Sequence, residues 1–407
     1  MWIVGLLIPS MFILDLLVWM IGDRVLRRAP RPDRWRAFYA AFMAVQLGSL
    51  LFIIFGRVAS SRTDEFLPRW LLSAVFVWHF IVLPVAAVIV IAARFTLPRK
   101  HAAPVAADNA ATPPVSAPNR RDFLRSLAVA APPVATVLTT GVAMSQQQEF
   151  RIRSFDLPLR QLPGDLDGLT IAQVSDIHVG RFTEESVVKK IVDATNALRA
   201  DLVLLTGDLI NHALADLPAG LDAVKRMDAR FGIYMIEGNH DLFESRAKFE
   251  RTVKESGVPL LLNESTTLSI RGQAVQLLGL KWGSANSNGS INTPSQRGDV
   301  AIADSMGVLM KQLEPGAFPI LMAHHPHAFD LAAQAGIPLT LSGHTHGGQL
   351  MASPQVGFGP LMFRYWSGLY AKDESKLIVS NGVGNWFPLR INAPAEIVQI
   401  TLRRSTV

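Results

Sequence analysis

The sequence predicts an α/β domain in the C-terminal part of the chain, preceded by an α-helical region that spans a membrane. The mean hydropathy is +0.26, and 18% of the 407 residues are charged, whereas soluble domains average roughly 25%. Long uncharged apolar runs lie before residue 150, and after it short apolar runs alternate with amphipathic stretches. The chain is therefore expected to divide near residue 150.

Three apolar runs in the first part are long enough for membrane helices. They cover residues 1–21, 38–56 and 70–93, and a helix of about 20 residues crosses a bilayer. We therefore expect three transmembrane helices within residues 1–97. Lys and Arg are more numerous after the first and third runs than after the second. This bias indicates that those two loops are cytoplasmic and that the amino terminus lies outside.

The segment that leads to the second part begins with a linker. Residues 98–119 are rich in Ala and Pro, as flexible linkers are. Residues 120–146 start with Arg120 and Arg121 and continue with an uncharged run. This pattern resembles a twin-arginine signal, which would make the export machinery a partner, and the alternative is a fourth transmembrane helix. Both alternatives place the following domain on the periplasmic or extracellular side of a bacterial inner membrane.

The positive charge of the chain belongs to the apolar part. Residues 1–150 carry a net charge of +7 and residues 151–407 a net charge of −1. A nucleic-acid-binding protein carries its basic excess on the folded domain, so no nucleic-acid partner is expected. The absence of cysteine excludes disulfides, thiol catalysis and thiolate metal sites.

Five predicted strands in the C-terminal part each end in a polar loop. The strands are residues 169–174, 201–205, 232–236, 318–323 and 338–341, with helices expected at 184–199 and 219–230. The loops read Ser-Asp-Ile-His, Thr-Gly-Asp, Gly-Asn-His-Asp, His-His-Pro and Gly-His-Thr-His-Gly-Gly. Because ligands gather at the carboxyl ends of strands in α/β sheets, we expect these loops to share one rim. Asp, Asn and His suit divalent ions such as Mn, Fe, Zn or Mg.

This series of motifs resembles the calcineurin-like metallophosphoesterase superfamily. The tail, at residues 368–370, 380–384, 388–390 and 394–397, is similar to the bacterial membrane-associated branch that includes YkuE and YaeI. The resemblance covers about residues 150–402. It implies that residues 150–407 fold as a four-layer α/β/β/α sandwich with a centre of two divalent metal ions.

The resemblance also implies seven ligands, in two sets joined by one carboxylate. They are Asp176, His178 and His346 for the first ion, Asn239, His324 and His344 for the second, and Asp208 for both. A hydroxide held between the ions would attack phosphorus. His240 would protonate the leaving oxygen, and Asp241 would orient His240 by accepting its other ring proton.

Two further side chains are candidates for substrate binding. Arg390 offers a fork of donors for a phosphate group, and a structural salt bridge is the alternative. His212 lies four residues after Asp208, where it would face either the substrate or the solvent.

The expected function is that of a membrane-anchored phosphoesterase. The same metal core would cleave phosphodiester, phosphomonoester or diphosphate bonds, and the anchor adds lipid substrates to the candidates. One alternative is hydrolysis of the diphosphate in UDP-2,3-diacylglucosamine during lipid A synthesis. Another is a non-catalytic membrane sensor that binds metal or phosphate.

Overall fold

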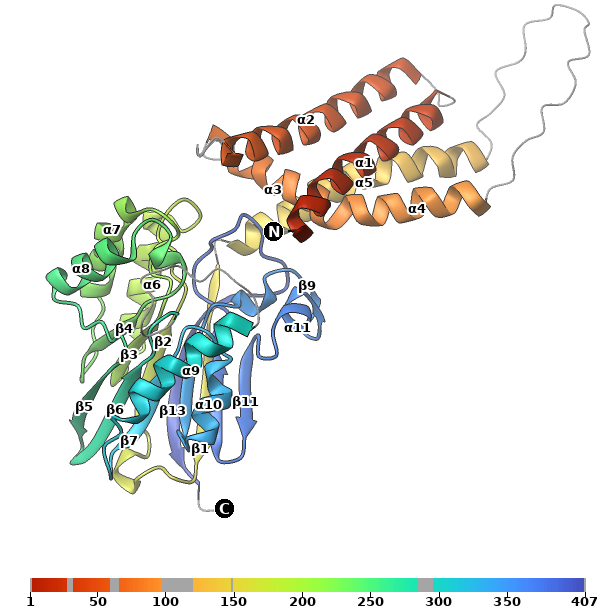
Figure 1. Cartoon of the computed structure of the whole chain (residues 1–407). Coiled ribbons are helices and arrows are strands. Elements are labelled where there is room, and N and C mark those ends of the chain that lie inside the picture. The colour runs from red at the N-terminus through yellow and green to blue at the C-terminus, as the bar shows by residue number, and fades with distance from the viewer. Residues whose placement is uncertain are drawn as a thin grey trace, which may run out of the picture. The chain divides into compact units, whose positions relative to one another are not determined.

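The computed structural model describes residues 2–27, 32–58, 66–96, 120–147, 149–283 and 296–405. The chain divides into two units, Met1–Met144 and Ser145–Val407 (Figure 1). The Ala/Pro-rich linker expected at residues 98–119 lies outside the described residues.

The N-terminal unit is helical. Its elements are α1 (Trp2–Leu26), α2 (Pro32–Val58), α3 (Arg69–Val77), the π-helix η2 (Trp78–Val82), α4 (Leu83–Thr96) and α5 (Arg120–Gln147), which continues into the second unit. In the described part of the chain, Pro32–Gly56 and Arg69–Ile89 are long and apolar enough, by length and composition, to cross a membrane. These two stretches coincide with the second and third of the predicted transmembrane helices.

A buried carboxylate connects α1 to the π-helix within this unit. Nε1 of Trp78 donates a hydrogen bond to Oδ1 of Asp15 at 2.7 Å. Nε2 of His79 lies 3.0 Å from Oδ2 of the same residue. A carboxylate buried among apolar helices is stable only with such partners. These contacts therefore fix α1 against η2.

The C-terminal unit contains two sheets, with strand orders β1-β13-β2-β3-β4 and β11-β12-β8-β7-β6-β5. The strands of the first sheet are β1 (Phe150–Leu159), β2 (Thr170–Val174), β3 (Leu202–Thr206), β4 (Ile233–Ile236) and β13 (Ala395–Arg404). Those of the second are β5 (Glu264–Ile270), β6 (Gln273–Gly279), β7 (Phe318–Met322), β8 (Leu339–Ser342), β11 (Gly368–Lys372) and β12 (Ser375–Val379). A separate hairpin consists of β9 (Met351–Ser353) and β10 (Val356–Gly357).

The functional edge of each sheet follows from its strand directions. Strands β2, β3 and β4 are mutually parallel, as are β6, β7, β8 and β12. Parallel strands have all their carboxyl ends at one edge of the sheet, so the loops that follow them lie close together there. Strand β13 runs antiparallel to β2 and pairs in parallel with β1, which extends the first sheet on the other side.

Helices cover the outer face of each sheet. They are α6 (Glu185–Ala197), α7 (Leu217–Lys225), α8 (Arg246–Ser256), α9 (Gln296–Met310) and α10 (Ala328–Gln334). The short α11 (Phe358–Met362) follows the β9–β10 hairpin. Four single-turn 3-10 helices complete the unit: η3 (Gly164–Leu166), η4 (Leu214–Asp216), η5 (His240–Leu242) and η6 (His346–Gly348). Figure 1 shows α6, α7 and α8 beside the first sheet, and α9 and α10 over the second.

Alternation of apolar side chains along the strands produces the layers. Leu202 and Leu204 of β3 belong to the core between the two sheets. Val203 and Leu205 point the other way and pack with residues of α6, α7 and α8. A third cluster joins α9 and α10 to the second sheet. Successive side chains of a strand face opposite sides, so strands that are apolar throughout become buried on both faces. The predicted four-layer sandwich is confirmed.

Candidate metal centre

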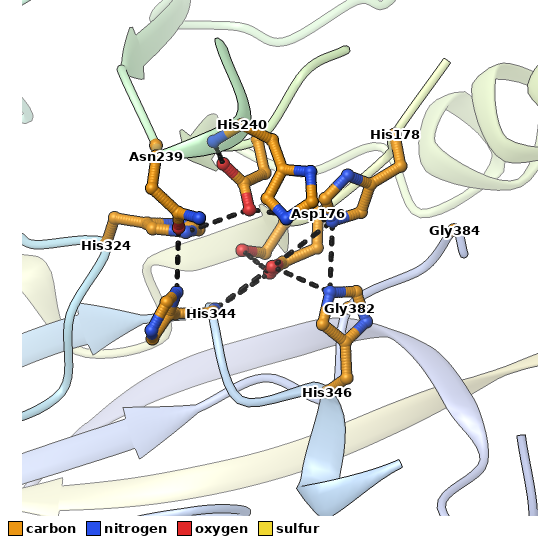
Figure 2. A network of polar contacts seen from close by, with 12 residues as sticks. Asp176, His178, Asn239, His240, His324, His344, His346, Gly382 and Gly384 are labelled. Carbon is orange, nitrogen blue, oxygen red and sulfur yellow. Dashed lines mark hydrogen bonds and ion pairs between the residues drawn. The ribbon is translucent and has the colours of Figure 1, made fainter. Parts of the chain in front are cut away.

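The seven predicted ligands lie together at the carboxyl ends of five strands. Asp176 and His178 follow β2, Asp208 follows β3, Asn239 follows β4, His324 follows β7, and His344 and His346 follow β8. Figure 2 labels six of them, and their side chains point toward one another: Asp176, His178, Asn239, His324, His344 and His346. All seven are buried or half-buried.

Three ligands form the first set. Nε2 of His178 and Nε2 of His346 face each other at 3.0 Å, and Nε2 of His346 lies 3.2 Å from Oδ1 of Asp176. The ligand atoms of the three residues all lie within 4.8 Å of one another. Two imidazole nitrogens and a carboxylate oxygen that converge in this way form a suitable donor set for a divalent cation.

The second set lies beside the first. Nε2 of His324 is 3.1 Å from Oδ2 of Asp208, and Nδ1 of His344 is 2.9 Å from Oδ1 of Asn239. Nδ1 of His324 contacts the carbonyl oxygen of Thr206 at 2.7 Å. A carbonyl that accepts from one ring nitrogen fixes the other nitrogen toward the metal. Nε2 of His324 is accordingly buried and faces the Asp208 carboxylate.

Asp208 lies between the two sets. The oxygen that approaches His324 is also 3.5 Å from Nε2 of His178. The other oxygen, Oδ1, accepts a hydrogen bond from the backbone N–H of His240 at 2.8 Å. One carboxylate oxygen thus faces a histidine of each set, as a residue that joins two ions must.

The electrostatics of the buried histidines fit cation binding. Burial, together with neighbouring histidines, holds the pKa of His178 and of His344 well below the ordinary value, so both rings are neutral at pH 7. Burial also lowers the pKa of His324, but the charge of Asp208 outweighs it and raises that pKa to about 9. The neutral imidazoles of His178 and His344 therefore match the donor set of a pair of divalent cations. His324 would give up its ring proton to a cation that takes its place beside Asp208.

The predicted partner of His240 is wrong. Nδ1 of His240 contacts the carbonyl oxygen of Asn211 at 2.7 Å, so a backbone oxygen orients this ring. The Asp241 carboxylate instead accepts three backbone N–H groups, from Asp208 at 3.0 Å, Ile210 at 3.0 Å and Gly238 at 2.9 Å. Asp241 therefore fastens the β3 and β4 loops to each other. A backbone carbonyl gives no signal in a sequence.

Arg390 does not have a phosphate-binding position. Its side chain is fully buried, and its nitrogens donate to side-chain or backbone atoms of Asn385, Asn381, Ala393 and Gly384. Nη2 also lies 3.1 Å from Nδ1 of His346. Four of the five guanidinium N–H donors are used by oxygen atoms inside the domain, and the side chain has no exposed surface that a phosphate could reach. None of these five partners is a carboxylate, so the alternative of a structural salt bridge also does not describe them.

His212 is exposed, and its ring centroid lies 5.1 Å from that of Phe243. Phe243 in turn lies 4.4 Å from the ring of His240. The role of His212 in substrate binding stays a prediction.

Aromatic side chains around the centre were not predicted from the sequence. The ring of Trp282 lies 5.1 Å from His344 and 5.4 Å from His324. Trp386 lies 5.6 Å from His240, and Phe363 lies 5.7 Å from His344. These residues occur singly in irregular segments, so no periodicity distinguished them from other surface aromatics.

Comparison with known proteins agrees with this geometry. Residues 169–348 match the family model of calcineurin-like phosphoesterases. A transmembrane protein with a metallophosphoesterase domain from Danio rerio is 30% identical over 278 residues, which are 67% of this chain and 62% of that protein. The metallophosphoesterase YkuE of Bacillus subtilis is 28% identical, over 60% of this chain and 82% of that protein. The phosphodiesterase YaeI of Escherichia coli is 26% identical, over 56% and 80%.

The four-layer sandwich and the carboxylate–histidine centre at its strand ends define a metallophosphoesterase domain. The C-terminal unit of this chain is a calcineurin-like phosphoesterase domain, and the predicted resemblance, including YkuE and YaeI as relatives, is confirmed. The chain spans 61–63% of the length of several curated relatives, among them the Danio rerio protein.

Proposed function

We propose that the C-terminal unit is a hydrolase that cleaves phosphoester bonds at a centre of two divalent cations. The position of Asp208 carries this proposal. Its Oδ2 lies 3.5 Å from His178 in one ligand set and 3.1 Å from His324 in the other. The match to calcineurin-like phosphoesterases supports the same chemistry.

The roles of the ligands follow from the two sets. Asp176, His178 and His346 would hold one ion, Asn239, His324 and His344 would hold the other, and Asp208 would contact both. Two such cations supply positive charge that polarises the phosphoester and activates water as the nucleophile. The protein contributes the fixed geometry, since every ligand extends from a loop at a strand end.

His240 is the proposed general acid. Its Nδ1–H donates to the carbonyl of Asn211, which leaves Nε2 as the nitrogen that can carry a proton to the leaving oxygen. The ligand atoms of His240, His178 and Asp208 lie within 4.8 Å of one another. A phosphoester held by the two ions would therefore be within reach of His240.

The surroundings of the centre favour a substrate with an apolar part. Phe243 and Trp386 contact the ring of His240, and Trp282 and Phe363 contact that of His344. Aromatic faces stabilise apolar groups by burial. We infer that the apolar part of a phosphate-containing lipid would fit these walls.

We further propose that the chain is a multi-pass protein of a bacterial inner membrane, with the C-terminal unit outside the cytoplasm. The apolar helices and the relative named as a transmembrane protein support membrane association. The residues around 120–146 would serve as a fourth span or as a twin-arginine signal. A carboxyl-terminal alkaline phosphatase fusion tests the orientation, because this reporter is active only outside the cytoplasm. A fusion that is expressed but inactive would contradict it.

Hydrolysis of bis-p-nitrophenyl phosphate by the purified full chain tests the proposed function. The protein would be stripped of metal, reloaded with Mn²⁺ and compared with Asp208→Asn and with the control Asp193→Asn. Asp193 is an exposed carboxylate on α6. We expect Mn²⁺-dependent turnover by the wild type and the control, and none by Asp208→Asn. Equal rates with and without metal would contradict the proposal.

The proposed role of His240 has its own test. A general acid accelerates a reaction by about 10²–10⁴-fold, and most when the leaving oxygen is strongly basic. His240→Ala should therefore slow the release of an alkyl alcohol much more than the release of p-nitrophenolate. An equal loss with both leaving groups would show that His240 has another role.

A further inference from the structure

Apolar side chains are concentrated on one small projection of the C-terminal unit. Val356, Phe358, Leu361 and Met362 are all exposed, and Leu361 and Met362 expose 81% and 65% of their surface. We call these four side chains the apolar tip. They lie within seven consecutive residues that comprise β10 and α11. Single exposed apolar residues are common on proteins, but a contiguous group indicates an interaction surface.

Close packing at glycines turns the apolar tip outward. A Cβ on Gly359 would lie 2.6 Å from Cδ1 of Trp366, so this side of α11 is pressed against the domain. A Cβ on Gly348 would collide with the backbone of Gly359. Gly348 ends η6, which begins at the ligand His346. Helix α11, which carries most of the apolar tip, thus packs against the 3-10 helix that begins at a metal ligand.

The chain enters the domain beside the same surface. The backbone N–H of Asn392 donates to Oε1 of Gln146 at 3.0 Å, and Nδ2 of Asn385 donates to the carbonyl of Gln147 at 2.8 Å. Asn392 also donates to the carbonyl of Met351 in β9 at 2.9 Å. The end of α5, the 385–392 loop and the hairpin that leads to α11 are therefore contiguous.

Helix α5 carries an apolar stripe shortly before Gln146 in the sequence. Val134, Val137, Leu138 and Val142 are exposed, and their spacing places them on one stripe of the helix. Val142 lies four residues before Gln146, a rise of about 6 Å along a helix. The chain therefore passes directly from this apolar stripe to the contacts that Gln146 and Gln147 make with the 385–392 loop.

Acidic residues are scarce in the sequence around the apolar tip. Residues 331–372 contain no Asp or Glu, and neither do residues 375–395. Arg364, two residues after α11, is exposed, and its guanidinium pairs with the carboxylate of Asp330. A second protein is a poorer partner, since specific protein interfaces use roughly 20–30 residues on each side. Exposed Phe and Leu side chains gathered on one short segment are typical of segments that lie in a lipid interface.

We propose that the apolar tip inserts into the lipid interface of the membrane that holds the N-terminal helices. Insertion brings the loop of His346 to the lipid surface, together with Trp386, which contacts His240. The site would then take phosphoesters of membrane lipids directly from the bilayer. Docking of the apolar tip goes beyond the proposed function and does not depend on it. The choice of membrane lipids as substrates does rest on the proposed function.

An activity comparison tests the choice of substrate. The variant Leu361→Glu/Met362→Glu would be compared with Val308→Glu, which alters an exposed apolar residue of α9. Each full-length protein would hydrolyse a vesicle phospholipid and soluble bis-p-nitrophenyl phosphate. We expect the double variant to lose at least tenfold on the vesicle lipid and nothing on the soluble ester. Equal activity of both variants on the vesicle lipid would overturn delivery from the bilayer.

A fluorescence measurement tests docking without requiring catalysis. The chain contains no cysteine, so Leu361→Cys and the control Val308→Cys each carry one label. The labelled full chain would be reconstituted into phosphatidylethanolamine–phosphatidylglycerol vesicles with nitroxide-bearing lipids. We expect the label at position 361 to be quenched at least twofold more than the label at 308. Equal quenching would overturn the proposal. If the wild type hydrolyses neither substrate, the proposed function fails while quenching still decides the docking.

Discussion

Five of the candidate ligands have a backbone conformation that residues with a Cβ rarely adopt. They are Asp176 (φ 55°), His178 (φ 49°), Asp208 (φ 56°), His344 (φ 72°) and His346 (φ 50°). The left-handed conformation costs about 1–2 kcal/mol per residue and persists only where the surroundings enforce it. The strain occurs at the points where the backbone leaves a strand and turns a ligand toward the centre. At the residue scale, the fold is therefore arranged around the donor atoms.

Asp241 provides a prediction at this scale, because its carboxylate accepts three backbone N–H groups. Each buried N–H left without an acceptor costs about 1–3 kcal/mol. Asp241→Ala should therefore lower the free energy of unfolding by about 3 kcal/mol or more, measured by chemical denaturation of the full chain in detergent. Glu244→Ala is the control, since this exposed carboxylate accepts one backbone N–H. Lost activity at unchanged stability would restore the original interpretation of Asp241 as the partner of His240.

At the scale of elements, the sequence predicted the parts of the fold that local patterns determine. The expected strand at residues 169–174 is β2 (Thr170–Val174), and the expected helix at 184–199 contains α6 (Glu185–Ala197). Strands β1 and β13 were not predicted, although they pair along ten residues. Their partners lie more than 240 positions apart, and pairing over that distance leaves no local pattern. The residue types of the site could be predicted because each ligand motif is a short local pattern at a strand end. The burial of Arg390 could not be predicted, because it depends on the packed fold.

The β3 loop and the β7 loop approach each other closely at one glycine, which gives a prediction for these elements. Gly207 has φ 96°, and a Cβ there would lie 2.5 Å from Nδ1 of His324. Gly316 has a similar φ of 83° with nothing within 4 Å. Both Gly→Ala variants carry backbone strain, but only Gly207→Ala adds overpacking, which costs about 1–3 kcal/mol. Calorimetric unfolding should show that extra loss. Equal losses of stability in the two variants would mean that the β3 loop shifts to make room for the added methyl group.

At the scale of the whole molecule, the chain combines an apolar helical unit with a metallophosphoesterase domain. The positive net charge of +6 belongs to the first part, and the domain is close to neutral. An attraction of the domain for phosphate would therefore come from bound cations, which a formal charge count omits. The same argument makes the cations part of the stability of the domain.

Removal of metal gives the corresponding prediction. Ions that bind only the folded state, at a hundred times their Kd, stabilise it by about 2.7 kcal/mol per site. With two sites, a chelator should therefore lower the Tm of the C-terminal unit by about 10–20 °C, and Mn²⁺ should restore it. Asp208→Asn should show little response to either addition. A Tm that ignores the chelator would contradict a resident metal centre.

The number of ions bound per chain tests the central claim most directly. Full-length protein would be dialysed against Mn²⁺ and its metal content determined by elemental analysis. We predict two ions for the wild type. His346→Ala, from one ligand set, and His344→Ala, from the other, should each retain one. A wild type that binds a single ion, or none, would contradict the account of two ligand sets joined by Asp208.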